Sequence, residues 1–495
     1  MASVVNARRL TGGILAMLAT AAPVWFGTGL DPFWPLMWFA AVPVLVFAVD
    51  ASAWGAALVA GLAMMLGVLN LWGLLHGVLK APLGMIAPLY IVEGVALALA
   101  ALLFRALMQR RAYWSALLAY PALWVSFEWF LNFAAPHGTA GSLAYSQLRF
   151  LPFLQLASVT GPWGMTFVLC AFAASVAIAI CLRSRAPAQG YRILATTAAG
   201  VIAVLAFGTV RLLMPATGIA VKVGLVSSDG PNEDVADAGA PATRLFQAYA
   251  PVIERLAEQG AAVVVLPEKT SVVLEPDVRA VDAEFQALAE RAHVRIAAGV
   301  LRIVPAHAPA PVLRYNEVRL YTPGAPVEHY DKEHMLPPFE SNLTPGTALT
   351  LVPASGGAGT WGLAICKDMD FTQLSRRYGA SGAGLMLVPG WDFFLDWIQH
   401  GHMAVMRGVE SGFSIARSAK GGTLFVSDDR GRIMGEIKSD AAPFSSLLVS
   451  VGQTHDRTLF LLLGDWFAWL AVTILALCLV QLVRQPLLAS AAYPM

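Results

Sequence analysis

Cys366 is the residue in this sequence whose side chain offers the most reactive nucleophile. It follows the apolar segment Trp361–Ile365 and precedes two charged residues, Lys367 and Asp368. The chain has four cysteines, and the other three lie in long apolar runs: Cys170, Cys181 and Cys478. A free cysteine is more often a small buried apolar group than a nucleophile, so chemistry at Cys366 requires neighbours that activate its thiol.

Two other charged residues stand where a base and a cation for such a thiol would be needed. Glu268 follows the apolar segment Ala262–Leu266 after one proline, and Lys332 follows Tyr330-Asp331. Alone, Glu268 would be a solvated loop carboxylate or a helix cap, and Lys332 would belong to a charged loop. A strand end that opens into a polar loop holds a side chain at a fixed position. A carboxylate, an ammonium group and a thiol at three strand ends therefore form a candidate catalytic set.

The elements that must position these side chains are predicted to form a layered α/β domain. From Ile219 onward, short β-branched segments alternate with segments of helical periodicity. Strands are predicted at 219–226, 262–266, 294–300, 314–321, 361–365, 385–388, 413–416, 423–426 and 447–451. Helices are predicted at 244–259 and 282–292.

The remainder of the sequence is too apolar for a water-soluble protein. Of all residues 57% are hydrophobic and 13% are charged, whereas soluble domains carry about 25% charged residues. Membrane spans of about 20 apolar residues are predicted at 10–28, 33–49, 54–77, 84–108, 113–133, 159–182, 192–213 and 459–483. We expect a seven-span membrane domain over 1–215, a catalytic domain over 216–456, and a final span with its tail over 457–495.

The positions of the arginines predict how the chain crosses the membrane. They gather before the first span, between spans four and five, between spans six and seven, and after the last span. Loops rich in basic residues face the cytoplasm, so seven crossings place 214–458 on the outer face, which is the periplasm in a bacterium with an inner membrane. The net charge of +1 gives no reason to expect nucleic acid.

Four polar residues lie at membrane depth: Asn70, His76, Glu93 and Glu128. Ionisable groups inside a membrane are costly, which favours a functional role. The alternative is that each bonds a neighbouring helix, and for Glu93 and Glu128 both interpretations stay open.

The ordered set of Glu268, Lys332 and Cys366 resembles the catalytic triad of the carbon–nitrogen hydrolase, or nitrilase, superfamily, and Glu340 matches a second glutamate of that superfamily. Together with the spans, the chain resembles the bacterial apolipoprotein N-acyltransferases over nearly its whole length. Further matching segments are Pro121–Val125, Glu128-Trp129, Tyr145–Gln147, Gln399-His400, Met403–Arg407, Glu410, Ala416–Ser418 and Gly464–Trp466.

The resemblance implies a membrane-bound N-acyltransferase whose catalytic domain is an α-β-β-α sandwich. Cys366 would take a fatty acyl group from a phospholipid as a thioester. The acceptor would be the N-terminal amine of a diacylglyceryl-modified cysteine on a lipoprotein, or another amine. Glu268 would act as the base, while Glu340 would orient Lys332 or assist proton transfer.

The remaining expectations concern the oxyanion and the partners. Lys332 and the backbone N–H of Lys367 would hold the tetrahedral oxyanion. The expected partners are a phospholipid donor, the amine acceptor and membrane lipids, with the protein acting as a monomer. We expect no nucleic acid, no cofactor and no metal, since the nine histidines show no ligand spacing.

The sequence departs from the acyltransferase pattern around the nucleophile. The family has an aromatic residue and then glutamate after its cysteine, where this chain has Lys367 and Asp368. Where the family has an Asn-Asp-aromatic stretch, this chain has Pro389–Phe394. The interval from Lys332 to Cys366 is also shorter than the one expected for the acyltransferases. A membrane-anchored amidase, or an N-acyltransferase for another amine, therefore stays open. A transporter or scaffold with an inactive domain would be expected to have lost a triad residue, and all three are present.

A dense group of large apolar side chains follows this departure. It consists of Trp391, Phe393, Phe394, Leu395 and Trp397. Because tryptophan is favoured at the membrane interface, we predict a segment that enters the interface beside an acyl pocket. With Asp368, these aromatic residues are the substrate-binding candidates. Packing in the protein core is the alternative.

Overall fold

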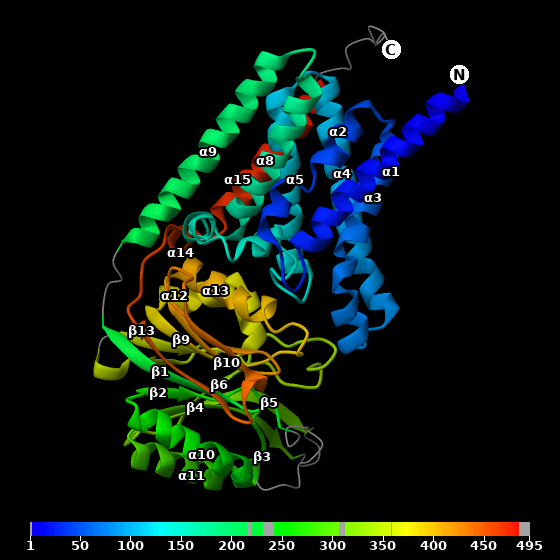
Figure 1. The fold of residues 1–495 in the computed structure, drawn as a ribbon. Coiled ribbons are helices and arrows are strands. Elements are labelled where there is room, and N and C mark those ends of the chain that lie inside the picture. Colours follow the sequence, from blue (N-terminus) through cyan, green and yellow to red (C-terminus); the bar gives the residue numbers. More distant parts are fainter. Residues whose placement is uncertain (1, 215–218, 231–241, 306–311, 358, 485–495) are drawn as a thin grey trace. The chain divides into compact units, whose positions relative to one another are not determined.

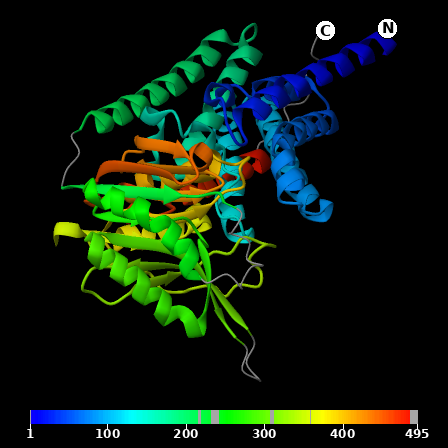
Figure 2. The ribbon, with the colours of Figure 1, turned by 60° about the horizontal axis from the view of Figure 1, so that its bottom comes forward.

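The computed structural model describes residues 2–214, 219–230, 242–305, 312–357 and 359–484 (Figure 1, Figure 2). The chain divides into two compact units. The first, called the helical unit, comprises Met1–Ala134, Gly141–Arg211 and Leu463–Met495. The second, called the sheet unit, comprises Ala135–Ala140 and Leu212–Leu462. The predicted boundary between residues 215 and 216 lies outside the described residues.

The helical unit is built from helices that pack side by side. They are α1 (Ala2–Gly27), α2 (Val42–Asp50), α3 (Ala53–Val68), α4 (Leu83–Gln109), α5 (Tyr113–Ala134), α6 (Leu151–Leu154), α7 (Ala157–Thr160), α8 (Pro162–Leu182), α9 (Pro187–Leu213) and α15 (Trp466–Arg484). Within the described residues, six helices are long and apolar enough to cross a membrane. These lie at Arg9–Gly27, Ala53–Leu71, Leu83–Gln109, Pro162–Leu182, Pro187–Leu213 and Trp466–Arg484.

The predicted count of about eight spans is therefore not confirmed. The segment predicted as the span 33–49 forms a 3-10 turn at Trp34–Trp38 followed by the nine-residue helix α2. Pro43 stands in the first turn of α2, where its missing N–H is tolerated, so a new helix begins there. The predicted span 113–133 does form one helix, α5, which carries Glu128 and Asn132.

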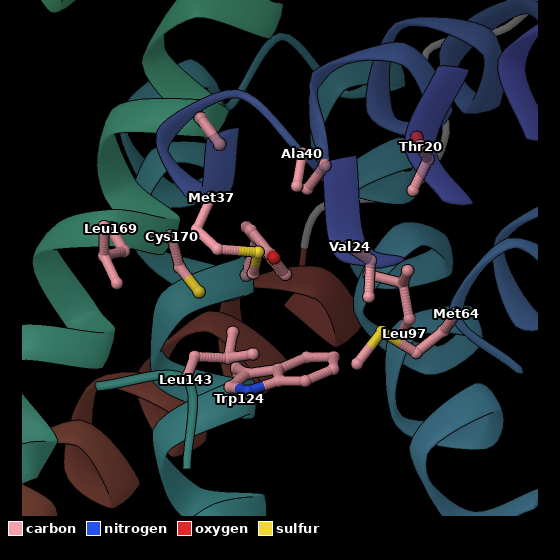
Figure 3. Close-up of a pocket in the computed structure, with 13 residues that line it drawn as sticks. Thr20, Val24, Met37, Ala40, Met64, Leu97, Trp124, Leu143, Leu169 and Cys170 are labelled. Carbon is pink, nitrogen blue, oxygen red and sulfur yellow. The ribbon is translucent and has the colours of Figure 1, made fainter. Parts of the chain in front are cut away.

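A cavity lies between helices of this unit (Figure 3). Its lining is almost entirely apolar and includes Val24, Met37, Leu97, Trp124 and Cys170. Its volume of about 20 Å³ suits one water molecule. It is far too small for a fatty acyl chain.

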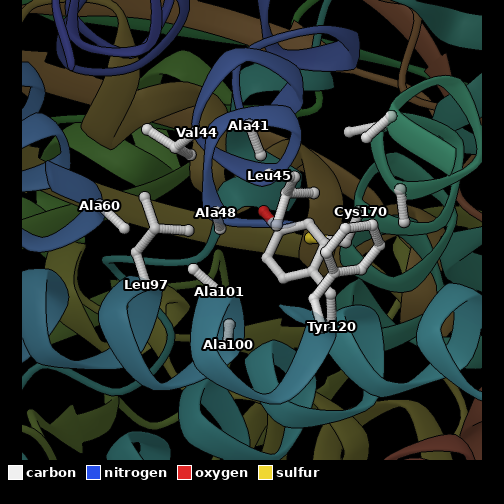
Figure 4. Packing of buried hydrophobic residues seen from close by; sticks show 14 of the residues in the cluster. Ala41, Val44, Leu45, Ala48, Ala60, Leu97, Ala100, Ala101, Tyr120 and Cys170 are labelled. Atoms are coloured by element: carbon white, nitrogen blue, oxygen red, sulfur yellow. The ribbon is translucent and has the colours of Figure 1, made fainter. Parts of the chain in front are cut away.

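Small residues form much of the core of the helical unit (Figure 4). Ala48, Ala60, Ala100 and Ala101 are all fully buried. Small side chains let helix backbones approach closely, which favours packing by van der Waals contact in a membrane. This explains why α2, α3 and α4 contact one another.

Glu128 has a complete set of hydrogen-bond partners inside the helical unit. Its carboxylate accepts from Trp124 Nε1 at 3.0 Å, Ser142 Oγ at 2.8 Å, the backbone N–H of Leu143 at 2.8 Å and Thr166 Oγ1 at 2.9 Å. These contacts join α5, α8 and the turn that begins at Leu143. They favour the structural interpretation of Glu128.

The sheet unit contains two sheets. The first has the order β13-β1-β2-β4-β5-β6, with β3 beside β4, and the second has the order β12-β11-β10-β9-β8-β7. The strands of the first are β1 (Ala220–Ser227), β2 (Val263–Val265), β3 (Ser271–Leu274), β4 (Arg295–Val304), β5 (Leu313–Tyr321), β6 (Glu328–Asp331) and β13 (Ser445–Gly452). Those of the second are β7 (Leu351–Pro353), β8 (Thr360–Leu363), β9 (Ala383–Trp391), β10 (Ser414–Lys420), β11 (Thr423–Ser427) and β12 (Ile433–Lys438).

Helices cover the outer face of each sheet, so the layers run helix, sheet, sheet, helix (Figure 1, Figure 2). Helices α10 (Ala242–Glu258) and α11 (Val278–Ala292) cover the first sheet, and α12 (Thr372–Ala380) and α13 (Gln399–Ser411) cover the second. In α10, Tyr249, Ile253 and Leu256 are buried, as their helical spacing predicts. The two sheets meet through β1, β2 and β4 against β9 and β10.

The predicted strands are all present with shifted ends, but four strands were not predicted. These are β3, β6, β7 and β12. Strand β6 carries charged residues in Glu328-His329-Tyr330-Asp331, while β3 and β7 have only four and three residues, which is too short for a clear strand signal.

Candidate active site

Cys366 lies where β8 ends, at the first residue of the 3-10 turn Cys366–Asp370. Its backbone has a φ of +45°, which is unfavourable for a residue with a β-carbon. Such strain typically costs about 1–3 kcal/mol and is concentrated at active sites. The side chain is buried, with 6% of its surface exposed. The turn therefore holds the thiol in a fixed direction.

Asp368 fixes this turn to the loop that bears Lys332. Its carboxylate accepts from the backbone N–H of Ile365 at 3.0 Å and from the hydroxyl of Tyr330 at 2.9 Å. It also accepts from the backbone N–H groups of Glu333 at 3.2 Å and His334 at 2.9 Å. Asp368 is completely buried, and the four bonds occupy its carboxylate within the protein.

The structure brings Glu268, Lys332 and Glu340 together in one buried ion-pair cluster. Lys332 Nζ lies 2.9 Å from Glu268 Oε1 and 2.8 Å from Glu340 Oε2. All three residues are 2–3% exposed. Glu268 follows β2 and Lys332 follows β6, so each side chain comes after a strand end, although β6 was not among the predicted strands.

Two residues that the sequence did not single out complete this cluster. Asn316 Nδ2 donates to Glu268 Oε1 at 2.6 Å and to Glu340 Oε1 at 3.0 Å. Lys269 forms an ion pair with Glu340 and lies 3.9 Å from Glu268. Asn316 lies in the middle of β5 and is completely buried. The negative charges of the two glutamates are thus balanced by the positive charges of the two lysines.

The charges of this cluster follow from its contacts. Burial alone would raise the pKa of Glu268, but Lys332 and Lys269 overcome this and hold the pKa below its usual value. Burial would lower the pKa of Lys332, but Glu268, Glu340 and Cys366 together raise it well above the usual value. Glu268 is therefore a carboxylate and Lys332 an ammonium group at neutral pH, and Cys366 is near enough to act on the charge of Lys332.

A second set of charged groups surrounds Cys366. Its Sγ lies 3.6 Å from the carbonyl oxygen of Trp391, 4.0 Å from His400 Nδ1 and 3.9 Å from Arg417 Nη2. Arg417 holds both carboxylate oxygens of Asp392, at 2.6 Å and 2.8 Å. Gly390 makes room for this pair, since a β-carbon there would lie 2.8 Å from Arg417 Nη2.

Cys366, Asp392 and His400 have ligand atoms within 4.8 Å of one another, a set that could hold a metal ion. Cys366 is far from the other two residues in the sequence, which therefore shows no metal-ligand spacing, and only the fold brings the three together. Arg417 binds both oxygens of Asp392, and a guanidinium at that position opposes a second cation. We therefore treat the group as an ion-pair network.

Lys367 belongs to a third group of contacts beside Cys366. Its Nζ lies 3.2 Å from Asp370 Oδ2 and 3.3 Å from His137 Nδ1. Burial and the neighbouring Lys367 lower the pKa of His137 to about 4, so its ring is neutral and Nδ1 can accept. Thr139 binds the carbonyl oxygen of Asp370 through both its N–H at 3.1 Å and its hydroxyl at 2.8 Å. Residues 135–140, which follow α5 in the chain, therefore pack against the turn that begins at Cys366.

The four aromatic candidates have different surroundings. Trp391 ends β9 and has Lys420 Nζ over its ring at 3.8 Å. Trp397 has Lys438 Nζ over its ring, also at 3.8 Å. The ring centroids of Phe393 and Phe339 are 6.1 Å apart, and Phe394 is 62% exposed. Their role in binding an acyl chain stays a prediction.

Two family comparisons cover most of the chain. Residues 12–175 match the apolipoprotein N-acyltransferase N-terminal domain, and residues 240–454 match the carbon–nitrogen hydrolase family. The chain is 26% identical over 394 residues to an apolipoprotein N-acyltransferase of Geobacter metallireducens, which covers 72% of each chain. It is 27% identical over 403 residues to an apolipoprotein N-acyltransferase of Bradyrhizobium diazoefficiens, covering 72% of this chain and 71% of that one.

Solved structures of the amidase from Nesterenkonia sp. resemble part of the chain. A variant of that amidase from strain AN1 is 19% identical, covers 49% of this chain and 93% of its own, and has a TM-score of 0.40. A second structure of the amidase is 20% identical, covers 49% of this chain and 93% of its own, and has a TM-score of 0.39.

Proposed function

Because the chain belongs to the apolipoprotein N-acyltransferase family of the carbon–nitrogen hydrolase superfamily, we propose that it acylates lipoproteins through a thioester on Cys366. The donor is a membrane phospholipid, and the acceptor is the N-terminal amine of a diacylglyceryl-modified cysteine. Two observations support this proposal: the buried ion pair between Glu268 and Lys332, and the thiol of Cys366 held at a strained turn.

The first half of the reaction forms the thioester. Glu268 takes the thiol proton while Cys366 Sγ attacks the carbonyl carbon of the phospholipid ester. Lys332 and the backbone N–H of Lys367, in the first turn of the 3-10 segment, stabilise the tetrahedral oxyanion. Loss of one such donor typically costs 10²–10³ in rate. The ester C–O bond then breaks, and the lysophospholipid alkoxide receives the proton held by Glu268.

The second half transfers the acyl group to the amine. The amine nitrogen attacks the thioester carbonyl, and Glu268 accepts a proton from that nitrogen. Collapse of the intermediate breaks the C–S bond, leaves the amide and returns the proton to Cys366. Glu340 keeps Lys332 in place throughout, because it binds Nζ at 2.8 Å without being needed as a base.

The membrane part of the proposal rests on the sequence pattern. We place the protein in a bacterial inner membrane as a monomer, with α5 and the segment 34–50 crossing in addition to the six candidate spans. The arginine distribution supports a periplasmic position for the sheet unit. Both substrates are lipids or lipid-modified, which accounts for an enzyme domain joined to membrane helices.

A transfer assay with purified full-length protein tests the function. The protein in mixed micelles is given phospholipid with isotope-labelled acyl chains and a peptide that begins with S-diacylglyceryl-cysteine. The proposal predicts a labelled amide on that peptide, detected by mass spectrometry, and no product from the same peptide with an acetylated N-terminus. Hydrolysis of small amides without transfer from phospholipid would instead support the membrane-anchored amidase.

A further inference from the structure

We propose that His400 is a further catalytic residue: as an imidazolium held between Asp370 and Asp392, it stabilises the thiolate of Cys366. This rests on the proposed function only in taking Cys366 as the nucleophile. The Glu268–Lys332 pair supplies a base and an oxyanion donor, whereas His400 and Arg417 supply positive charge in direct contact with the sulfur atom.

Both ring nitrogens of His400 face groups that accept hydrogen bonds. Nδ1 lies 3.0 Å from Asp392 Oδ1 and 4.0 Å from Cys366 Sγ. Nε2 lies 3.4 Å from Asp370 Oδ1. A neutral imidazole has one N–H, whereas the cation has two. Only the cation can donate toward both carboxylates, so the geometry favours the charged ring.

The charges around the sulfur atom are balanced when Cys366 is ionised. Lys332 already faces Glu268 and Glu340, and Lys269 also pairs with Glu340. Beside Cys366, the three cations Lys367, His400 and Arg417 face the two carboxylates Asp370 and Asp392. A thiolate supplies the missing negative charge.

Other titratable groups near the ring do not reverse this balance. Asp396 accepts from the backbone N–H of His400 at 3.1 Å, and burial raises its pKa to about 7, so its charge is only partial at neutral pH. His137 contacts Lys367 and is neutral at that pH. Although burial opposes the charge of His400, Cys366, Asp370 and Asp392 together raise the pKa of the ring well above its usual value.

The proposed role is electrostatic and leaves the proton transfers unchanged. Glu268 still takes the thiol proton, and His400 with Arg417 stabilises the thiolate that this transfer produces. A charge within contact of a thiolate favours ionisation and so increases the reactive fraction.

Alkylation of Cys366 by iodoacetamide tests this role without any lipid substrate. The full-length protein in detergent micelles is compared with His400→Gln, which keeps a hydrogen-bond donor but cannot be charged, and Cys366 alkylation is followed by peptide mass spectrometry from pH 5 to 10. At pH 7 we expect His400→Gln to react at least tenfold more slowly than the wild type. The difference should shrink at high pH, because a thiol in sufficiently alkaline solution is ionised whether or not a neighbouring cation assists it.

His402→Gln is the matched control. It removes a histidine from the same helix, and His402 Nε2 binds Glu436 at 2.7 Å; we expect a wild-type alkylation rate. If His400→Gln does not fold, Asp370→Asn tests the same point, because it removes the carboxylate that faces Nε2, and a slower reaction at pH 7 is expected. A rate within twofold of the wild type in the folded variant would overturn the proposal. That result would leave acyl transfer untouched, whereas failed transfer with the predicted alkylation pattern would count against the proposed function alone.

Discussion

Tyr330 donates its hydroxyl hydrogen to Asp368 Oδ2 at 2.9 Å, and this bond joins the strand that leads to Lys332 with the turn that begins at Cys366. Both partners are buried. Tyr330→Phe leaves a buried carboxylate with one donor fewer, which typically costs about 1–3 kcal/mol. We expect a lower melting temperature and slower acyl transfer. Tyr315→Phe is the control, since the ring of Tyr315 packs against Arg302. Equal melting temperatures for the two variants would contradict this role of the Tyr330 hydroxyl.

Asn316 is one of the groups that, after Lys332 and Lys269, favour the charged form of Glu268. Asn316→Asp would replace the amide that donates to Glu268 and Glu340 with a third carboxylate of the same shape. A neighbouring negative charge favours protonation, so the pKa of Glu268, now below its usual value, should rise. Because the base must be deprotonated to act, the acid limb of the pH–rate profile should move to higher pH by at least one unit. An unmoved acid limb would show that Glu268 is not the base.

Gly299 allows the turn at Glu268 to pass close to β4. A β-carbon at this position would lie 2.7 Å from Glu268 Cα and 3.0 Å from the backbone nitrogen of Lys269. Overpacking of this kind costs about 1–3 kcal/mol, and misplacement of a catalytic group by about 1 Å can cost 10²-fold in rate. We expect Gly299→Ala to reduce transfer by about 10²-fold. Gly452→Ala, in β13 of the same sheet with open space around it, should keep wild-type activity. Similar losses in both variants would contradict the proposed close approach.

The residues that the sequence identified are those at the ends of apolar segments. Glu268 and Cys366 each follow a strand that pairs in parallel with its neighbour, and such ends are recognisable because an apolar run changes to polar residues. Lys332 was identified by its place in an ordered motif, since its strand, β6, was not predicted. The local sequence pattern therefore indicated Glu268 and Cys366, and the family motif added Lys332.

The residues to which the sequence assigned no role act through contacts between distant segments. Asn316 lies inside β5, where a single polar residue gives no local signal, and its partners come from two other loops. His400, Asp392 and Arg417 meet only because α13, β9 and β10 pack together. The predicted count of about eight spans is not confirmed for a local reason: at Pro43 a new short helix begins inside an apolar run.

The acyl-enzyme is the central intermediate of this account, and its mass is the most direct measurement. Full-length protein purified from membranes, or incubated with phospholipid without an acceptor, should carry one fatty acyl group on Cys366. The adduct should disappear with neutral hydroxylamine, which cleaves thioesters, and on addition of the lipopeptide amine. Cys366→Ala should carry none. An adduct of the same mass on Cys366→Ala, or acyl transfer that persists in that variant, would contradict the account.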